Sequence, residues 1–228
     1  MPKQVRIIIP HEAHHITQRG NYRQEIFEDD DDFRQYLAWL KEYSRKYKID
    51  ILAYCLMNNH VHLIGTPKDK ESFAKAFNTL AMRYSQYINR KRKSYGHVWQ
   101  GRYFSCVLDE IYLYRTIRYV EQNPVRARIV DDAWDYKWSS ARTHVGIETD
   151  SIIPLKKTFN MDTEEWKQYL KEVDEEANKE MRLKTKRGLV VGTEAFIKKL
   201  EKRLKRSLKC LDPGRPKKGS RPPYEATS

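Results

Sequence analysis

The order of apolar patterns in the first half of the chain constrains its fold more than any other feature of the sequence. β-favouring runs and segments with helical spacing follow one another as strand, helix, two strands, helix, strand, helix. The expected strands are 14–19, 49–57, 61–65 and 103–108, and the expected helices are 33–47, 73–88 and 110–123. This order predicts an α+β fold, compatible with a ferredoxin-like antiparallel sheet with helices on one face.

Local signals mark the ends of several of these elements. The acidic cluster Asp29–Asp32 precedes the first helix, where carboxylates complement the helix dipole. The polar pair Asn58 and Asn59 separates the second and third strands, which predicts a hairpin. Pro124 ends the third helix, because a proline disfavours helical geometry in the residue before it.

Net charge is distributed unevenly along the 228 residues. Of the net charge of +13, the segment Arg182–Ser228 carries +11, because it holds 15 Lys and Arg against 4 Asp and Glu. Such an asymmetry favours a polyanionic partner, either nucleic acid or an acidic membrane surface. Residues 1–181 carry only +2. We expect three parts: a globular domain over 1–146, a basic helical extension over 147–211 and a disordered basic tail over 212–228.

The cysteines and the apolar runs exclude several classes of protein. Cys55, Cys106 and Cys210 are odd in number and far apart, so we expect neither a disulfide framework nor a zinc knuckle. No apolar run approaches the length of a membrane span, and Ile7–Ile9 is too short for the core of a signal peptide. These features predict a cytoplasmic protein that associates with the nucleoid if its partner is DNA.

His60 and His62 are two residues apart in an expected strand, so their side chains point to the same face of the sheet. Val61 and Leu63 then point into the core. Two imidazoles on a rigid strand can share one divalent metal ion and leave positions open for a third ligand and for substrate oxygens. The alternative is a pair of exposed histidines on the polar face of an amphipathic strand.

The expected helix 110–123 carries a tyrosine largely outside its apolar stripe. The stripe lies at positions i, i+4 and i+7, which are Leu113, Ile117 and Val120. Tyr119 is roughly 100° from Val120 and roughly 200° from Ile117 around the helix axis. This position fits a functional tyrosine, and it equally fits a tyrosine on an amphipathic surface.

The neighbours of Tyr119 on this helix leave alternatives open. Asn123, four residues on, shares its face, and its carboxamide oxygen can bind a metal ion or orient a phosphate. Tyr114 lies closer to the apolar stripe and is the better core candidate. Tyr112 is the nearest rival to Tyr119 for a functional role.

Basic side chains are expected to contact the phosphate backbone of a nucleic acid. The candidates are Arg19, Arg83, Arg90, Lys91, Arg102, Arg115, Arg126, Lys202, Arg203 and Arg206. The last three lie in the second of two helices expected near 163–184 and 193–209, whose apolar stripe can dock onto the core; a solvated, charge-rich helix is the alternative. Arg215, within Gly214–Pro216, is typical of arms that enter the minor groove, and a flexible cationic tail is the alternative there.

Five segments in order resemble those of the REP-associated tyrosine transposases, a branch of the single-tyrosine HUH transposases. They are His15–Asn21, Tyr54–Leu63, His97–Arg102, Arg118–Ala127 and Trp138–Ser140. Any one segment alone is a weak signal, whereas the ordered set over residues 15–140 is specific.

The resemblance implies a ferredoxin-like nuclease domain in which His60 and His62 hold Mg²⁺ or Mn²⁺. It implies that Tyr119 is the nucleophile on single-stranded DNA beside a small hairpin or palindrome. In the wider superfamily the residue four positions after the tyrosine is usually Gln, whereas here it is Asn123, whose side chain is shorter. Asn123 is therefore the expected third ligand, with Gln122 as the alternative.

The implied reaction is a DNA strand transfer. A tyrosine hydroxyl with a pKa of about 10 is a weak nucleophile at neutral pH, so polarisation of the scissile phosphate by a metal ion would assist its attack. The product would be a 5′-phosphotyrosine and a free 3′-OH. Because the phosphoester bond is exchanged rather than hydrolysed, rejoining needs no ATP.

Two other functions fit parts of this pattern. A non-catalytic DNA hairpin-binding protein on the same fold has no need of His60, His62 and Tyr119 together. A relaxase or replication-initiator nuclease uses the same chemistry but does not account for the other segments. The sequence therefore predicts a metal-dependent transposase that cleaves and rejoins single-stranded DNA next to hairpins, with a homodimer as one option for its assembly.

Overall fold

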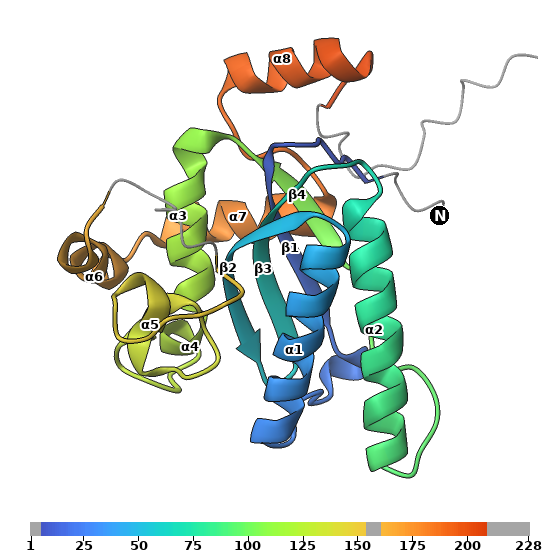
Figure 1. Ribbon diagram of the computed structural model, residues 1–228. Coiled ribbons are helices and arrows are strands. Elements are labelled where there is room, and N and C mark those ends of the chain that lie inside the picture. Colours follow the sequence, from blue (N-terminus) through green and yellow to red (C-terminus); the bar gives the residue numbers. More distant parts are fainter. Residues whose placement is uncertain (1–5, 154–160, 209–228) are drawn as a thin grey trace, which may run out of the picture.

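The computed structural model describes residues 6–153 and 161–208, and its centre is a four-stranded sheet (Figure 1). The strands are β1 (Ala13–Arg19), β2 (Ile49–Met57), β3 (His60–Pro67) and β4 (Phe104–Leu108). They pair antiparallel in the order β2-β3-β1-β4, and β2 and β3 form the predicted hairpin. This topology confirms the predicted α+β, ferredoxin-like antiparallel sheet.

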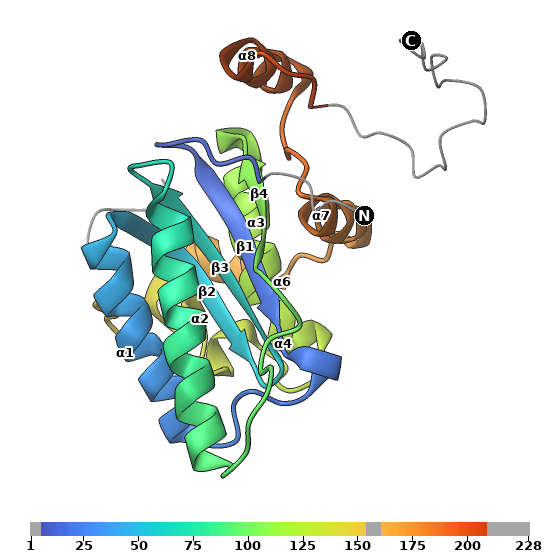
Figure 2. The ribbon, with the colours of Figure 1, turned by 90° about the vertical axis from the view of Figure 1, so that its right-hand side faces the viewer.

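The sheet carries helices on both faces (Figure 2). On one face lie α1 (Asp30–Lys46) and α2 (Ser72–Lys91), and His14 of β1 contacts Phe73 of α2 there. The next residue, His15, points to the opposite face, where its ring packs against Tyr119 of α3 (Glu110–Glu121). Helix α7 (Glu175–Arg187) lies on this second face as well, against β4 and β1.

The predicted layer of helices on one face is formed by α1 and α2. The sequence did not predict the second layer, which α3 and α7 form on the other face. The physical reason is visible in β2, where five successive residues, Ala53–Met57, are all buried. A strand buried on both faces reads as a continuous apolar run rather than as an alternation. The second layer, whose helices come later in the chain, covers the other face of this strand.

Short elements and two further helices complete the described residues. They are η1 (Asn21–Arg23), α4 (Asn123–Arg126), η2 (Ala133–Asp135), α5 (Ala141–His144), α6 (Thr163–Lys171) and α8 (Glu194–Leu204). The single helix predicted near 163–184 is wrong, because α6 and α7 are separate. Asp174 begins α7 by accepting a hydrogen bond from the backbone N–H of Ala177. Among the described residues, no helix combines the length and the apolar composition of a membrane span.

Helix α8 docks through the predicted apolar stripe. Leu200 is fully buried in a second, smaller core together with Ile7, Ile9 and Val107 near the β4 edge of the sheet. Phe196, Ile197 and Leu204 pack against this cluster. The docking prediction for this helix is confirmed. The predicted tail over 212–228 lies outside the described residues.

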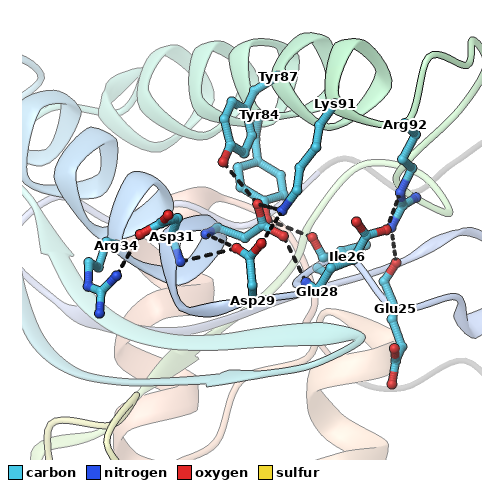
Figure 3. Close-up of polar contacts among 11 residues, drawn as sticks. Glu25, Ile26, Glu28, Asp29, Asp31, Arg34, Tyr84, Tyr87, Lys91 and Arg92 are labelled. Atoms are coloured by element: carbon cyan, nitrogen blue, oxygen red, sulfur yellow. Dashed lines mark hydrogen bonds and ion pairs between the residues drawn. The ribbon is translucent and has the colours of Figure 1, made fainter.

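A network of acids and bases fixes the start of α1 against the end of α2 (Figure 3). Asp32 is completely buried and accepts hydrogen bonds from the Glu28 backbone N–H, the Tyr87 hydroxyl and the Lys91 ammonium group. Lys91 also binds Asp29, the N-cap of α1, with an Nζ–Oδ2 distance of 2.8 Å. The network therefore uses the acidic cluster twice, to cap one helix and to join it to the other.

His14 makes the stability of the fold depend on pH. It is fully buried: its Nδ1 lies 2.8 Å from the Glu12 carbonyl oxygen, and its Nε2 accepts a hydrogen bond from the Ile9 N–H. Burial lowers its pKa from 6.5 to about 4, against a small rise from the Glu12 carbonyl. Between these values the unfolded chain binds more protons than the folded one. The His14 contribution is therefore complete above pH 6.5 and is lost as the pH falls towards 4.

We expect His14 alone to lower the free energy of unfolding by about 2 kcal/mol between pH 7 and pH 5. In His14→Gln the free energy of unfolding should depend less steeply on pH, because up to one proton fewer is taken up on unfolding. Urea unfolding at several pH values measures this slope. Identical slopes in the variant and the wild type would contradict this assignment.

Candidate active site

A cavity of about 1460 Å³, which we call the cleft, opens on the second face of the sheet. Residues from β1, β3, β4, α3, α4 and α7 line it. His60 and His62 of β3 and Tyr119 of α3 are all among them. The fold therefore brings together the three side chains that the sequence singled out.

The histidine pair follows from the alternation of β3. Val61 and Leu63 are buried on the α1–α2 side, whereas His60 and His62 line the cleft with ring centroids 5.0 Å apart. The Nδ1 atom of His60 lies 2.6 Å from Asn59 Oδ1, and that of His62 lies 2.9 Å from His15 Nε2. In both rings Nδ1 is engaged in a hydrogen bond, which leaves Nε2 as the nitrogen available to a ligand.

Both imidazoles are held in the neutral form. Burial, with smaller effects from Arg19 and Arg126, lowers the pKa of His60 to about 4. The pKa of His62 lies well below 6.5, first through burial and then through His60, His15 and the same two guanidinium groups. A neutral imidazole keeps the lone pair that metal coordination requires, so this pair can bind a divalent ion near neutral pH.

Tyr119 is more enclosed than its position outside the apolar stripe indicated, because only 5% of it is exposed. Its ring lies edge-on to those of His15 and His62, at centroid distances of 5.8 and 5.9 Å. Tyr112, its rival, is half-buried and lines a separate, small cavity between α3 and α7. Tyr114 is half-buried against the main core. Tyr119 is thus the tyrosine of this group that lies in the cleft.

Arg126 is half-buried beside Tyr119. Its guanidinium carbon lies 4.3 Å from the centre of the Tyr119 ring, and its NH2 group donates a 2.7 Å hydrogen bond to the Tyr119 carbonyl. Its Nε and NH1 atoms are buried and have no hydrogen-bond partner among the described residues. Burial lowers its pKa, against an opposing effect of Tyr119. Unpaired N–H groups over the ring of this tyrosine are suited to bind an anion.

Asn123 and Gln122 occupy different environments. Asn123 lines the cleft, and its Nδ2 donates to the carbonyls of Tyr119 and Val120, so its Oδ1 is the remaining polar atom. Gln122 is buried, and its Nε2 donates to the carbonyls of Leu170 and Glu172. Gln122 therefore faces the α6 side, and only Asn123 shares the cleft with the histidines. Among the described residues, no three His, Cys, Asp or Glu side chains are grouped so that they could hold a metal ion.

The predicted DNA-binding residues fall into groups. The cleft is lined by Arg19, Arg102 and Arg126. Arg83, Arg90 and Lys91 are carried by α2 on the opposite side of the sheet, where Lys91 is paired with Asp29 and Asp32. Arg115 lines two other cavities and not the cleft. Lys202, Arg203 and Arg206 lie on or just after α8, and Arg215 lies outside the described residues.

Several residues of the cleft escaped the sequence analysis. They are His15, Arg6 and four side chains at the end of α7: Arg182, Thr185, Lys186 and Arg187. The basic run of α7 is visible in the sequence, but nothing local indicates that it packs against β4 and β1. His15 had a usable signal, since it begins the first of the recognised segments and points to the same face as His62.

The sequence over residues 11–123 matches the model of the family described as IS200-like transposases. Comparison with curated proteins gives no significant match. A solved structure of a REP-associated tyrosine transposase bound to a REP hairpin is 17% identical, covers 72% of this chain and 96% of its own, and has a TM-score of 0.56. A Deinococcus radiodurans R1 protein assigned as a transposase is 20% identical, with coverages of 53% and 97% and a TM-score of 0.37. The likeness to the REP-associated transposase supports the fold described above. The TM-score of the Deinococcus protein is too low to support any conclusion.

Segments beyond residue 123 hold α3 in place. Glu121, on α3, is completely buried, and its carboxylate accepts hydrogen bonds from the Ser140 hydroxyl at 2.5 Å and the Trp166 indole N–H at 3.0 Å. The same carboxylate lies 2.6 Å from His144 Nδ1. Because Glu121 is two residues from Tyr119, this cluster sets the position of the tyrosine helix relative to α5 and α6.

We expect Glu121→Ala to lower the free energy of unfolding by about 3 kcal/mol, because buried donors then lose their acceptor. Glu110→Ala, which removes an exposed glutamate from the same helix, should change it by less than about 0.5 kcal/mol. Urea unfolding measures both values. Equal effects of the two substitutions would show that the buried cluster does not hold the helix.

Proposed function

Because the chain belongs to the IS200-like transposase family, we propose that it is a DNA strand transferase that cleaves and rejoins single-stranded DNA beside short hairpins. The observation that carries the proposal is the position of Tyr119, enclosed in the cleft beside His62 and under the unpaired N–H groups of Arg126. The five recognised segments and the likeness in fold to a hairpin-bound REP-associated transposase support that branch of the family and a hairpin substrate.

His60 and His62 fit the Mg²⁺ or Mn²⁺ ion that the family implies. Both rings are neutral, and both have Nδ1 engaged, so two Nε2 atoms are left for an ion. Asn123 is the proposed third ligand, through its Oδ1. When bound, the ion supplies Lewis-acid polarisation of the scissile phosphate.

The proposed reaction exchanges one phosphoester bond for another. The Tyr119 hydroxyl loses its proton and forms an O–P bond with the scissile phosphate, and the bond from phosphorus to the 3′ oxygen breaks. The leaving 3′ oxygen takes up a proton, which gives a 3′-OH and a 5′-phosphotyrosine. Attack of a different 3′-OH on the phosphotyrosine reverses the step and rejoins the strand without ATP.

Arg126 is the proposed partner of the phosphate during this exchange. Its Nε and NH1 groups lack acceptors in the described residues, and phosphate oxygens would supply them. Its hydrogen bond to the Tyr119 carbonyl fixes its position relative to the nucleophile. Arg19 and Arg102, which line the same cleft, are suited to hold the flanking backbone.

Removal of the Tyr119 hydroxyl should abolish covalent attachment to DNA. The full-length protein is incubated with Mg²⁺ and an end-labelled single-stranded hairpin, and the products are separated on a denaturing gel. We expect a protein–DNA adduct in the wild type and in Tyr112→Phe, and none in Tyr119→Phe. Chelation of the metal should also prevent the adduct.

Each departure from this pattern has a defined meaning. An adduct that persists in Tyr119→Phe but disappears in Tyr112→Phe would show that Tyr112, and not Tyr119, is the nucleophile. Cleavage that is unchanged by chelation would remove the metal role of His60 and His62. Binding without cleavage across a set of hairpins would favour a non-catalytic hairpin-binding protein.

Arg126→Gln should lower the single-turnover cleavage rate by about 10²- to 10³-fold, the usual effect of losing one hydrogen-bond donor at a developing negative charge. Hairpin affinity should change only a few-fold, because the other cationic groups of the cleft remain. Arg34→Gln, on α1 on the opposite side of the sheet, is the matched control and should cleave at the wild-type rate. Equal rates for Arg126→Gln and the wild type would exclude this role.

A further inference from the structure

A chain of hydrogen bonds runs from His62 in the cleft to Cys106 on β4. His62 Nδ1 lies 2.9 Å from His15 Nε2, and His15 Nδ1 lies 2.8 Å from the Thr185 hydroxyl oxygen. That oxygen lies 3.2 Å from Cys106 Sγ. The two imidazole rings are nearly parallel, with 7° between their planes. The four side chains come from β3, β1, α7 and β4.

The burial of this chain limits where its protons can be. His15 is 1% exposed and Thr185 is 2% exposed, so His15 is neutral and carries one ring proton. A neutral imidazole donates from one nitrogen and accepts at the other, and the tautomers of His15 and His62 are therefore coupled. When His15 donates to Thr185, it accepts from His62 Nδ1. When Thr185 donates to His15, the direction of both bonds reverses.

The two directions have opposite consequences at the cleft. In the first, His62 carries its proton on Nδ1, and Nε2 has a free lone pair. In the second, Nε2 carries the proton and cannot bind a metal ion. Arg19 and Arg126 line the cleft, and their charges act on His62. A lone pair directed into the cleft is attracted by these charges and an N–H group is repelled, so the first direction is favoured.

We propose that Thr185 and His15 are positioning residues that hold His62 as the Nδ1–H tautomer and so present Nε2 to a divalent cation. The proposal rests on the metal role of the histidine pair in the proposed function. Thr185 lies outside the 11–123 segment that matches the family, so helix α7, which follows that segment in the chain, would complete a site that the segment begins. We call the chain of hydrogen bonds from Thr185 through His15 to His62 the relay. His60 needs no relay, because the Asn59 side chain already accepts a hydrogen bond from its Nδ1.

The first test reads the tautomer directly in the metal-free, full-length protein. Long-range ¹H–¹⁵N correlation spectra distinguish a protonated from an unprotonated ring nitrogen, and the spectrum of His62→Gln assigns the signals. We expect His62 to carry its proton on Nδ1 in the wild type. Protonation at Nε2 would overturn the proposal whatever the variants do.

The second test removes the Thr185 hydroxyl without changing the shape of the side chain. In Thr185→Val, His15 loses its acceptor, so we expect an increased Nε2–H population of His62 and a Mn²⁺ affinity lower by about 10-fold or more in calorimetry. Thr185→Ser restores a hydroxyl and should bind within about 2-fold of the wild type. Wild-type tautomer and wild-type affinity in Thr185→Val would overturn the proposal.

Thr116→Val is the matched control for packing. Thr116 is as buried as Thr185 and contacts Met181 of α7, but its hydroxyl donates to the Tyr112 carbonyl, outside the chain of hydrogen bonds. Its Mn²⁺ affinity should equal that of the wild type. An equal loss in Thr116→Val would assign the effect to the packing of α7 and contradict the relay.

Failure of the relay and failure of the proposed function give different results. Absence of Mn²⁺ binding in the wild type would remove the metal role itself. Normal binding in the wild type that is lost in His62→Gln but unchanged in Thr185→Val would leave the proposed function intact and remove only the relay. If Thr185→Val does not fold, the wild-type tautomer spectrum and Thr185→Ser still decide.

Discussion

The packing of α3 across the second face of the sheet is the contact on which the candidate active site depends. It places the Tyr119 ring against the imidazoles of His15 and His62. Because the tyrosine is on a helix and the histidines are on central strands, their relative positions are set by the core rather than by a loop. Glu121 strengthens this arrangement from the other side of α3, through its hydrogen bonds to Ser140 and Trp166.

The partners of the cationic groups matter more for function than their number. Lys91 is neutralised by Asp29 and Asp32, and the Arg92 guanidinium is bound to Glu28, so the basic end of α2 serves the structure (Figure 3). Arg126, in contrast, keeps two buried N–H groups without a partner among the described residues. A buried donor without an acceptor is costly, and a site that binds an anion is where a protein recovers that cost.

Local periodicity predicted the sheet, its two first helices and the common face of His60 and His62, because strand alternation and helical spacing need only nearby residues. It did not place Tyr119 at 5% exposure, because the rings of His15 and His62 that pack against it are distant in the sequence. It did not find Thr185 either, since the contact of α7 with His15 spans 170 residues of sequence. The separate acids Asp162 and Asp174 each cap a helix, which is why one predicted helix is two. Long-range packing of charged helices has no sequence period to reveal it.

The boundary predicted between 146 and 147 does not divide the core. Trp166, Leu170 and Met181 belong to the same buried cluster as the residues of β2 and β3. Without α6 and α7, Glu121 would lose the Trp166 donor and His15 would lose the Thr185 hydroxyl. The first residues of the basic segment, Arg182 and Thr185–Arg187 at the end of α7, therefore also line the cleft. In the proposed arrangement, the docking of α7 brings Thr185 to His15 and so determines which ring nitrogen of His62 carries the proton.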